Sequence, residues 1–293
     1  MKKIKWLFIA LIAMVSWSCN GEDDLNPNSI FDSGKGIVEN EFDTWIYNNY
    51  TKPYNIEFKY RFEDKEADYS YNLAPAEYTR AIALAKMTKH VWVESYEELV
   101  GSEFIRTYCP KILFLVGSFA YNSQGSIVLG TAEGGLKIVL YNVNGIDVDN
   151  PDLAMLNYWF FKTMHHEFGH ILNQTKNYSV DFNLISPSNY QSSSWVNVSN
   201  QAALDMGFVS PYASSETGED FVEIISIYVT STEAGWNSLV GRASTEGQSM
   251  INQKLDLVKD YMLTTWGINM DELRAIVLRR SNDILTMDLK TLN

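Results

Sequence analysis

The stretch TMHHEFGHIL, Thr163 to Leu172, constrains the fold more than any other part of the chain. His166 and His170 are four residues apart, and side chains with this spacing lie on one face of an α-helix. Both imidazoles can then reach one metal ion, while Glu167 is turned aside from the pair and can act on a water molecule. The spacing therefore predicts a helix with His166 and His170 as zinc ligands and Glu167 as general base.

His165 stands directly before this pair and does not share its spacing. Its neighbours on the helix are apolar, namely Phe161, Phe168 and Leu172, so we expect a packed histidine, or one that supports a ligand, and not a ligand itself. Gly169 lies in the interior of the same helix, where glycine costs about 1 kcal/mol relative to alanine. Its missing side chain predicts a close approach by another backbone.

The third zinc ligand must come from elsewhere in the chain. The sequence has four histidines, and the one outside this stretch is His90, far upstream. We expect a solvated or satisfied side chain there, although its use as a ligand stays open. No histidine follows His170 within the next two turns, so a carboxylate on a later helix is the expected ligand.

The best source of this carboxylate is the segment YASSETGEDFVEII, Tyr212 to Ile225. Thr217 and Asp220 have the spacing of a capping pair, which predicts that a helix begins there. Glu219 and Glu223 then lie on one face of that helix. Glu219 is predicted to be the third ligand, and Glu223 is predicted to accept a hydrogen bond from a ligand histidine and so fix its orientation.

Hydrophobic periodicity and turn residues predict an α+β chain. The expected elements, in chain order, are a strand over 56–62, a long helix opening near Pro75 and running to about 100, a meander of three strands (111–121, 125–132 and 136–143), the motif helix over 151–174, a loop-rich stretch to Thr217, and helices from 217, over about 246–264 and over 270–280. This order predicts a mixed β-sheet with a long helix packed on it, then the motif helix and a mainly helical C-terminal lobe. The domain spans 37–293, with lobes of about 37–175 and 176–293.

Two features of the middle of the chain suggest further sites. Asp147, Asp149 and Asp152 could bind calcium, but they lack the glycine and distal glutamate of an EF-hand loop, so a solvated loop is the default. The run GGLKIVLYNV, 134–143, comes just before the motif helix. It could form an edge strand along which an extended peptide binds by main-chain hydrogen bonds.

The N-terminus has the pattern of a secretory leader. A lysine-rich start precedes an apolar run from Trp6 to Val15, which is too short to span a bilayer. Cys19 follows as in the lipobox of bacterial lipoproteins, although Trp17 departs from the small residue usual there. We expect removal of the signal peptide 1–18, lipidation of Cys19 and an acidic tether over 19–36. The alternative is a plain signal peptide with an incidental cysteine.

Charge and cysteine content exclude some classes of protein. The formal net charge is −13, which argues against nucleic acid as a partner because phosphate contacts need basic surface. Once Cys19 is lipidated, only Cys109 remains, so no intramolecular disulfide is expected. The acidic tract NGEDDLNPN after Cys19 resembles the surface-export signal of Bacteroidetes lipoproteins. It predicts an outer-membrane lipoprotein exposed on the cell surface, with a periplasm-facing location as the alternative.

HEFGH, followed after a long loop by Y-x6-E-D-F-V-E, resembles the gluzincin arrangement. In particular it is similar to the zinc lobe of anthrax lethal factor, a similarity that covers only the motif helices. Together with GFVSPYA and the lipobox, these motifs also resemble the zinc-binding metallopeptidase lipoproteins of Bacteroidetes, of the substrate import-associated zinc metallohydrolase type. That second resemblance covers most of the chain, and its members are found alongside TonB-linked nutrient importers.

The resemblance implies a zincin-like fold with one Zn²⁺ per chain, held by His166, His170 and Glu219. It makes Glu167 the general base and Tyr212 the residue whose hydroxyl faces the oxyanion of the reaction. We expect a cell-surface zinc metallopeptidase that hydrolyses peptides or glycoproteins for nutrient acquisition, anchored by lipid only and associated with a TonB-dependent importer. The alternatives are a non-catalytic surface substrate-binding lipoprotein serving such an importer, and a hydrolase of non-peptide amides.

Overall fold

The computed structural model describes residues 39–121, 125, 127, 128, 130–133 and 136–292. The fold described here is that of the compact unit 41–293. The predicted signal peptide, Cys19 and the acidic tether lie outside the described residues. None of the described helices is both long enough and apolar enough to cross a membrane.

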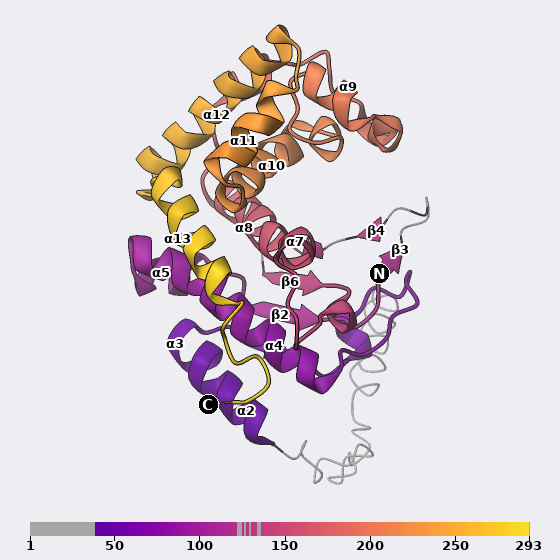
Figure 1. Cartoon of the computed structure of the whole chain (residues 1–293), viewed down its shortest axis with the longest axis vertical. Coiled ribbons are helices and arrows are strands. Elements are labelled where there is room, and N and C mark those ends of the chain that lie inside the picture. The colour runs from indigo at the N-terminus through magenta and orange to yellow at the C-terminus, as the bar shows by residue number, and fades with distance from the viewer. Residues whose placement is uncertain (1–38, 122–124, 126, 129, 134–135, 293) are drawn as a thin grey trace, which may run out of the picture. The chain divides into compact units, whose positions relative to one another are not determined.

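The described part is mostly helical, with a small mixed sheet in its N-terminal half (Figure 1). The first half contains α2 (Glu41–Ile46), η1 (Tyr47–Thr51), α3 (Lys52–Tyr54), η2 (Asp64–Glu66), α4 (Tyr78–Thr88), η3 (Lys89–Val93), α5 (Glu94–Val100), α6 (Ser102–Tyr108), η4 (Val143–Gly145), α7 (Leu153–Leu156), η5 (Asn157–Phe161) and α8 (Lys162–Thr175). The second half contains η6 (Val180–Leu184), η7 (Ser192–Asn197), α9 (Asn200–Asp205), η8 (Tyr212–Ser214), α10 (Thr217–Thr230), α11 (Glu233–Gly241), α12 (Thr245–Trp266) and α13 (Met270–Asp283). The predicted α+β class is confirmed. The sequence patterns did not predict the helices α2, α6, α9 and α11.

Four strands form the main sheet in the order β1-β2-β6-β5. Their bounds are β1 (Glu57–Lys59), β2 (Ile112–Leu115), β5 (Gly130–Glu133) and β6 (Lys137–Leu140). β1 and β6 both pair parallel with β2, while β5 pairs antiparallel with β6. The predicted mixed sheet is therefore confirmed. The run 134–143 contributes β6, which lies inside the sheet, so its prediction as an edge strand is wrong and β5 has that position.

The predicted meander is wrong because the run 111–121 does not stay in one strand. After β2 ends, Val116 forms an isolated bridge with Pro75. A Cβ atom on Gly117 would lie 2.1 Å from the carbonyl oxygen of Pro75. The two backbone segments therefore pass so close to each other that only glycine fits at this position. The continuation forms a separate hairpin of β3 (Ala120–Tyr121) and β4 (Ile127–Val128).

The two central strands are buried on both faces, as is usual for parallel strands. Leu113 and Leu115 of β2 face the main core, which contains the side chains of the long helices. Phe114 faces a smaller core on the other side, with Val139 of β6 and Tyr141. The alternation of side chains along each strand divides these apolar residues between the two cores.

The predicted long helix is present as the run α4–η3–α5, from Tyr78 to Val100, with one π-helical turn in the middle. It begins three residues later than its opening proline suggested, because Pro75 is held in the bridge with Val116. The motif helix likewise contains a π-helical turn, η5, between α7 and α8. Asp152 caps its start by accepting hydrogen bonds from the N–H groups of Ala154 and Met155.

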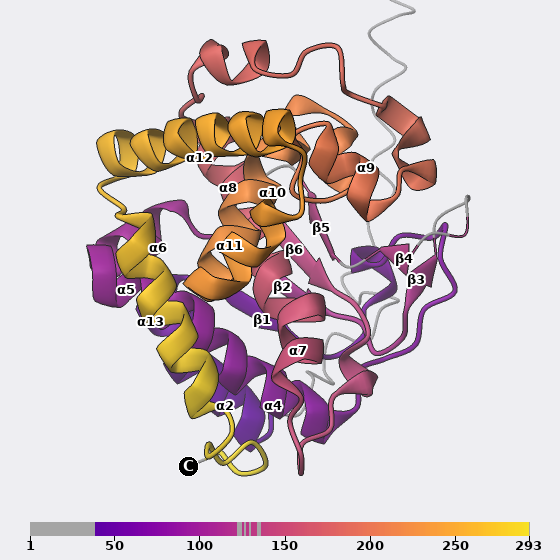
Figure 2. The ribbon, with the colours of Figure 1, turned by 45° about the horizontal axis from the view of Figure 1, so that its top comes forward.

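α8 and α10 pack side by side, and both views show them next to each other (Figures 1 and 2). Gly169 lies at their contact. A Cβ atom there would lie 2.9 Å from Cγ1 of Val222 and 3.5 Å from Cδ1 of Ile225. The expected close approach at Gly169 is therefore real, but side chains of α10 make it and not a backbone.

α10 begins at Thr217 as predicted, but the predicted capping pair is wrong. The N-cap residue is Glu216, and no side chain caps the helix. Asp220 is instead fully buried and pairs with the ammonium of Lys254 on α12, 2.7 Å away. An acidic residue in the first turn of a helix suits a cap by its spacing, yet here tertiary packing determines where its carboxylate lies.

Candidate metal centre

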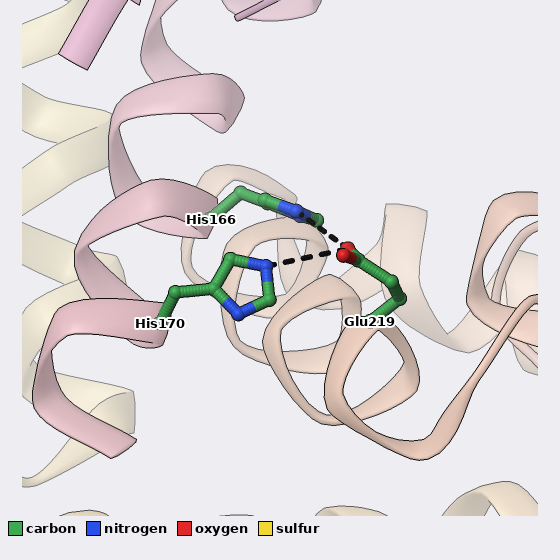
Figure 3. A group of neighbouring side chains, drawn as sticks. All are labelled: His166, His170 and Glu219. Carbon is green, nitrogen blue, oxygen red and sulfur yellow. Dashed lines mark hydrogen bonds and ion pairs between the residues drawn. The ribbon is translucent and has the colours of Figure 1, made fainter. Parts of the chain in front are cut away.

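Three potential ligand atoms from α8 and α10 converge on one point (Figure 3). Nε2 of His166 lies 3.0 Å from Oε2 of Glu219, and Nε2 of His170 lies 3.3 Å from the same oxygen. Among the described residues, these three form the one group of histidine, cysteine and acidic side chains whose ligand atoms lie within 4.8 Å of one another. The structure thus brings together the three ligands predicted from the sequence.

Glu223 holds the far side of the His166 ring. Nδ1 of His166 lies 2.9 Å from Oε1 of Glu223, so the ring donates an Nδ1 proton there, and Nε2 is the nitrogen that faces the site. The carboxylate is 1% exposed and also accepts from Lys162 at 2.9 Å and from the Ser210 hydroxyl at 2.6 Å. Burial alone would raise its pKa, but Lys162 and these hydrogen bonds hold the pKa of Glu223 well below its usual range.

The two carboxylates favour positive charge at this point. Burial would lower the pKa of His166, but its hydrogen bonds with Glu219 and Glu223 raise that pKa to about 10. Burial would likewise raise the pKa of Glu219, while hydrogen bonds with His166 and His170 lower it to about 2. Both pKa shifts have the same cause: the carboxylates of Glu219 and Glu223 stabilise positive charge beside them.

The donor set fits Zn²⁺. Two imidazole nitrogens and one carboxylate oxygen are ligands that zinc prefers. A second carboxylate behind one of the histidines is the outer partner that such ligands usually have. Three protein ligands are one fewer than a closed structural zinc site has, and they leave a position for a water molecule or substrate.

Glu167 and Tyr212 lie at the same centre. Glu167 is 7% exposed, and burial raises its pKa, opposed by the nearby His166 and His170. The ring of Tyr212 stacks on His166 with centroids 5.9 Å apart, and Trp195 packs edge-on against Tyr212 at 5.0 Å. Burial, then the charges of Glu219 and Glu167, raise the pKa of Tyr212 above its usual value. Its phenol therefore stays protonated and can donate a hydrogen bond.

The other two histidines are occupied elsewhere. His165 is fully buried, lies 2.9 Å from the hydroxyl of Tyr96 through Nδ1, and has its pKa lowered by burial to about 3. It is a neutral core residue, as predicted. His90 lies 3.2 Å from a carboxylate oxygen of Glu94 and 3.0 Å from one of Asp283, so it is satisfied away from the metal centre.

The structure does not bring together the three aspartates considered for calcium. Asp147 accepts hydrogen bonds from backbone N–H groups of its own loop, at Asp149 and Asn150. Asp149 pairs with Lys290, and Asp152 caps α7. Each carboxylate has a partner of its own, and the three form no metal-binding group among the residues that the structure describes.

The sequence analysis missed two residues that contact Glu223, namely Lys162 and Ser210. Lys162 precedes His166 by four residues and His170 by eight, so the same helical spacing that identified the histidines places it on their face. This signal was available in the sequence. Ser210 lies in the loop before α10, where periodicity carries no information about side-chain contacts.

Comparison with known proteins identifies the family. Residues 35–271 match the family described as "Putative zinc-binding metallo-peptidase". A crystal structure of a "putative zinc-binding metallo-peptidase" from Bacteroides caccae is 41% identical, covers 86% of this chain and 95% of its own, and superposes with a TM-score of 0.74. No curated protein matches the chain. Since the family match spans well over half of the 293 residues, the chain belongs to the "Putative zinc-binding metallo-peptidase" family.

Proposed function

We propose that this protein is a zinc-dependent peptidase of the gluzincin type with a zincin-like fold, in which His166, His170 and Glu219 hold one Zn²⁺. The observation that carries the proposal is the convergence of these three ligand atoms while Glu223 holds the other nitrogen of His166. Three ligands favour catalysis over a purely structural role, because structural zinc sites are normally closed by four. Membership of the family and the Bacteroides caccae relative support zinc as the metal.

The chain's own residues account for the proton transfers of amide hydrolysis. The chemistry that zinc supplies to such a site is Lewis acidity, which lets water lose a proton near neutral pH. Glu167 accepts that proton as the water attacks the scissile carbonyl, and later gives it to the nitrogen of the leaving amine. The phenol of Tyr212 donates a hydrogen bond to the oxyanion that develops on the carbonyl oxygen.

The proposed substrate is an extended peptide, free or within a glycoprotein. β5 is one of the two edge strands of the sheet, and it contacts α8, the helix that carries the histidines. An extended peptide can add to such an edge by main-chain hydrogen bonds, which positions its carbonyl groups without requiring a particular sequence. The net charge of −13 makes a nucleic acid substrate unfavourable.

For the cellular setting we propose an outer-membrane lipoprotein on the cell surface. The support is the sequence pattern of the first 36 residues, namely a leader, Cys19 in a lipobox and an acidic tether. In this proposal the membrane contact is made by lipid only. The peptidase would serve nutrient acquisition beside a TonB-dependent importer, as the resemblance to such lipoproteins implies.

The test is a Glu167→Gln variant assayed on a peptide library whose new N-termini are sequenced. We expect it to keep its zinc content and to lose activity by a factor of about 10² to 10⁴, the usual contribution of a general base. Glu246→Gln, at an exposed position in the first turn of α12, is the matched control and should cleave like the wild type. Undiminished cleavage by Glu167→Gln would refute the mechanism. A zinc-loaded wild type that cleaves no peptide or glycoprotein would instead favour a binding lipoprotein.

A further inference from the structure

We propose that Lys254 and Asp220 form a buried positioning pair. The pair holds two parts of the metal centre in place, namely the first turn of α10, which carries Glu219, and the loop before α10, which carries Ser210. This inference rests on the proposed zinc site, because its predicted effect is on zinc affinity. The pair lies on α12 and α10, and neither side chain has any exposed surface. Neither residue belongs to the predicted ligand set.

The ammonium of Lys254 has an enclosed and specific environment. Its Nζ lies 2.7 Å from Oδ2 of Asp220 and donates to the carbonyl oxygen of Gly207 at 2.8 Å. The ring of Phe208 lies 4.1 Å from Nζ, a distance suited to a cation–π contact. The hydroxyl of Tyr190 donates to the same Oδ2 of Asp220 at 2.8 Å. One buried cation thus joins three separate segments of the chain.

One of these contacts bears on the ligand Glu219. Asp220 is its immediate neighbour in the first turn of α10, where no side chain caps the helix. Helix ends fray readily when their N–H groups lack partners. The Lys254 contact holds this turn against α12 and so restricts where the Glu219 carboxylate can lie relative to α8.

The other contact bears on the loop before α10. Gly207 has a φ of +87°, a conformation that favours glycine, and its carbonyl oxygen accepts from Lys254. Three residues later, Ser210 donates to Glu223, the carboxylate behind His166. Tyr212, two residues further on, stacks on the His166 ring. The lysine therefore anchors the start of the segment that supports both residues.

Stability alone does not account for a charge pair in this position. Removing two charges from water costs free energy that their attraction often fails to recover, and apolar replacements of buried pairs are commonly neutral or stabilising. Oδ1 of Asp220 also has no hydrogen-bond partner among the described residues, which adds to the cost. What the pair supplies is a fixed geometry, since its three partners can be satisfied together in one arrangement of α10, α12 and the loop.

The test uses the full chain with Asp220→Asn and Lys254→Met combined, because either change alone leaves a buried charge or a cavity that could prevent folding. Zinc affinity is measured by competition with a fluorescent chelator, and urea unfolding of the metal-free proteins is measured in parallel. We expect the double variant to bind zinc about 10-fold or more weakly, in the range found for outer partners of metal ligands, while its unfolding midpoint stays close to that of the wild type.

Val258→Ala is the matched control. It removes apolar packing from the same helix, one turn beyond Lys254, at a fully buried position, and leaves the ion pair intact. We expect it to lower the unfolding midpoint and to keep zinc affinity within about twofold of the wild type, because packing loss by itself acts on stability. Equal zinc affinity in the double variant and the wild type would overturn the inference, as would equal losses in the double variant and Val258→Ala. A wild type that binds no zinc would refute the proposed function itself.

Discussion

At the scale of single residues, the metal centre follows from helical spacing more than from any other signal. Counting four residues from His166 to His170, and again from Glu219 to Glu223, places each pair on one helix face. The structure brings these faces together. The same count would have found Lys162. Tyr212 could be named only through a family resemblance, because its loop has no periodicity, and Ser210 had no signal at all.

Glu223 should control zinc affinity without touching the ion. In Glu223→Gln the side chain keeps its size but loses the charge that pairs with Lys162 and the hydrogen-bond geometry at Nδ1 of His166. We expect zinc binding to weaken about 10- to 100-fold, as measured by chelator competition. The exposed Glu233→Gln is the control. Unchanged affinity in Glu223→Gln would show that His166 needs no partner behind it.

Tyr212→Phe separates the phenol from the ring. Phenylalanine can keep the stacking on His166 and the contact with Trp195, so zinc affinity should be retained. We expect kcat to fall about 10²-fold or more with little change in KM, because an oxyanion donor acts mainly in the transition state. Tyr69→Phe, at a side chain that is 83% exposed, is the control. A loss confined to KM would place Tyr212 in substrate binding instead.

At the scale of elements, local sequence patterns predicted the positions of the helices better than the order in which the strands pair. The long run α4–η3–α5 was readable from apolar spacing, and α10 begins where a capping pair was expected although that pair does not form. The parallel pairing of β2 with β6 was not, because it depends on the glycine that lets the chain leave the sheet beside Pro75. The capping prediction failed for a similar reason, since α12 supplies a partner for Asp220 that no local pattern reveals.

The contact between α8 and α10 predicts whether Gly169→Ala raises or lowers the free energy of unfolding. Alanine at position 169 gains about 1 kcal/mol in helix propensity over glycine. In this protein its Cβ would lie 2.9 Å from Cγ1 of the stiff Val222 side chain, and such overpacking costs about 1–3 kcal/mol. We expect Gly169→Ala to be neutral or destabilising in the wild type and stabilising in a Val222→Ala background. Urea unfolding of the wild type, Gly169→Ala, Val222→Ala and the double variant measures these changes. Equal stabilisation by Gly169→Ala in both backgrounds would contradict the packing argument.

At the scale of the whole molecule, charged side chains connect the C-terminal helix to the N-terminal half. Glu94 of α5 pairs with Arg280 of α13 at 2.8 Å and with Lys89 at 2.6 Å. Burial would raise the pKa of Glu94, but hydrogen bonds with His90 and Lys89 and the charge of Arg280 lower it to about 2. No sequence pattern indicates this connection, because its members are nearly 190 residues apart.

This lowered pKa predicts a particular loss of stability in acid. A carboxyl group whose pKa falls on folding stabilises the protein above its unfolded pKa, and that contribution is lost as the pH falls through the folded pKa. For Glu94 the window runs from its ordinary pKa of 4.5 down to about 2. We expect Glu94→Gln to be less stable than the wild type at pH 7 by up to about 3 kcal/mol, with the difference vanishing near pH 2.

Urea unfolding at a series of pH values measures this difference. Glu103→Gln, at a carboxylate whose side chain is 82% exposed, is the control and should differ little from the wild type at any pH. A difference for Glu94→Gln that stays constant from pH 7 to pH 2 would mean that lost packing, and not charge, is responsible.

The edge position of β5 bears on which proteins the proposed peptidase could degrade. β5 pairs with β6 on one side, and no strand of the described residues covers the other. A chain that binds there must offer its own backbone groups, which in a folded protein are already paired. Cleavage would then be limited by how often a target opens locally. Flexible linkers and partly unfolded proteins would be cut first, so conformational stability would protect a well-folded protein that meets the proposed peptidase.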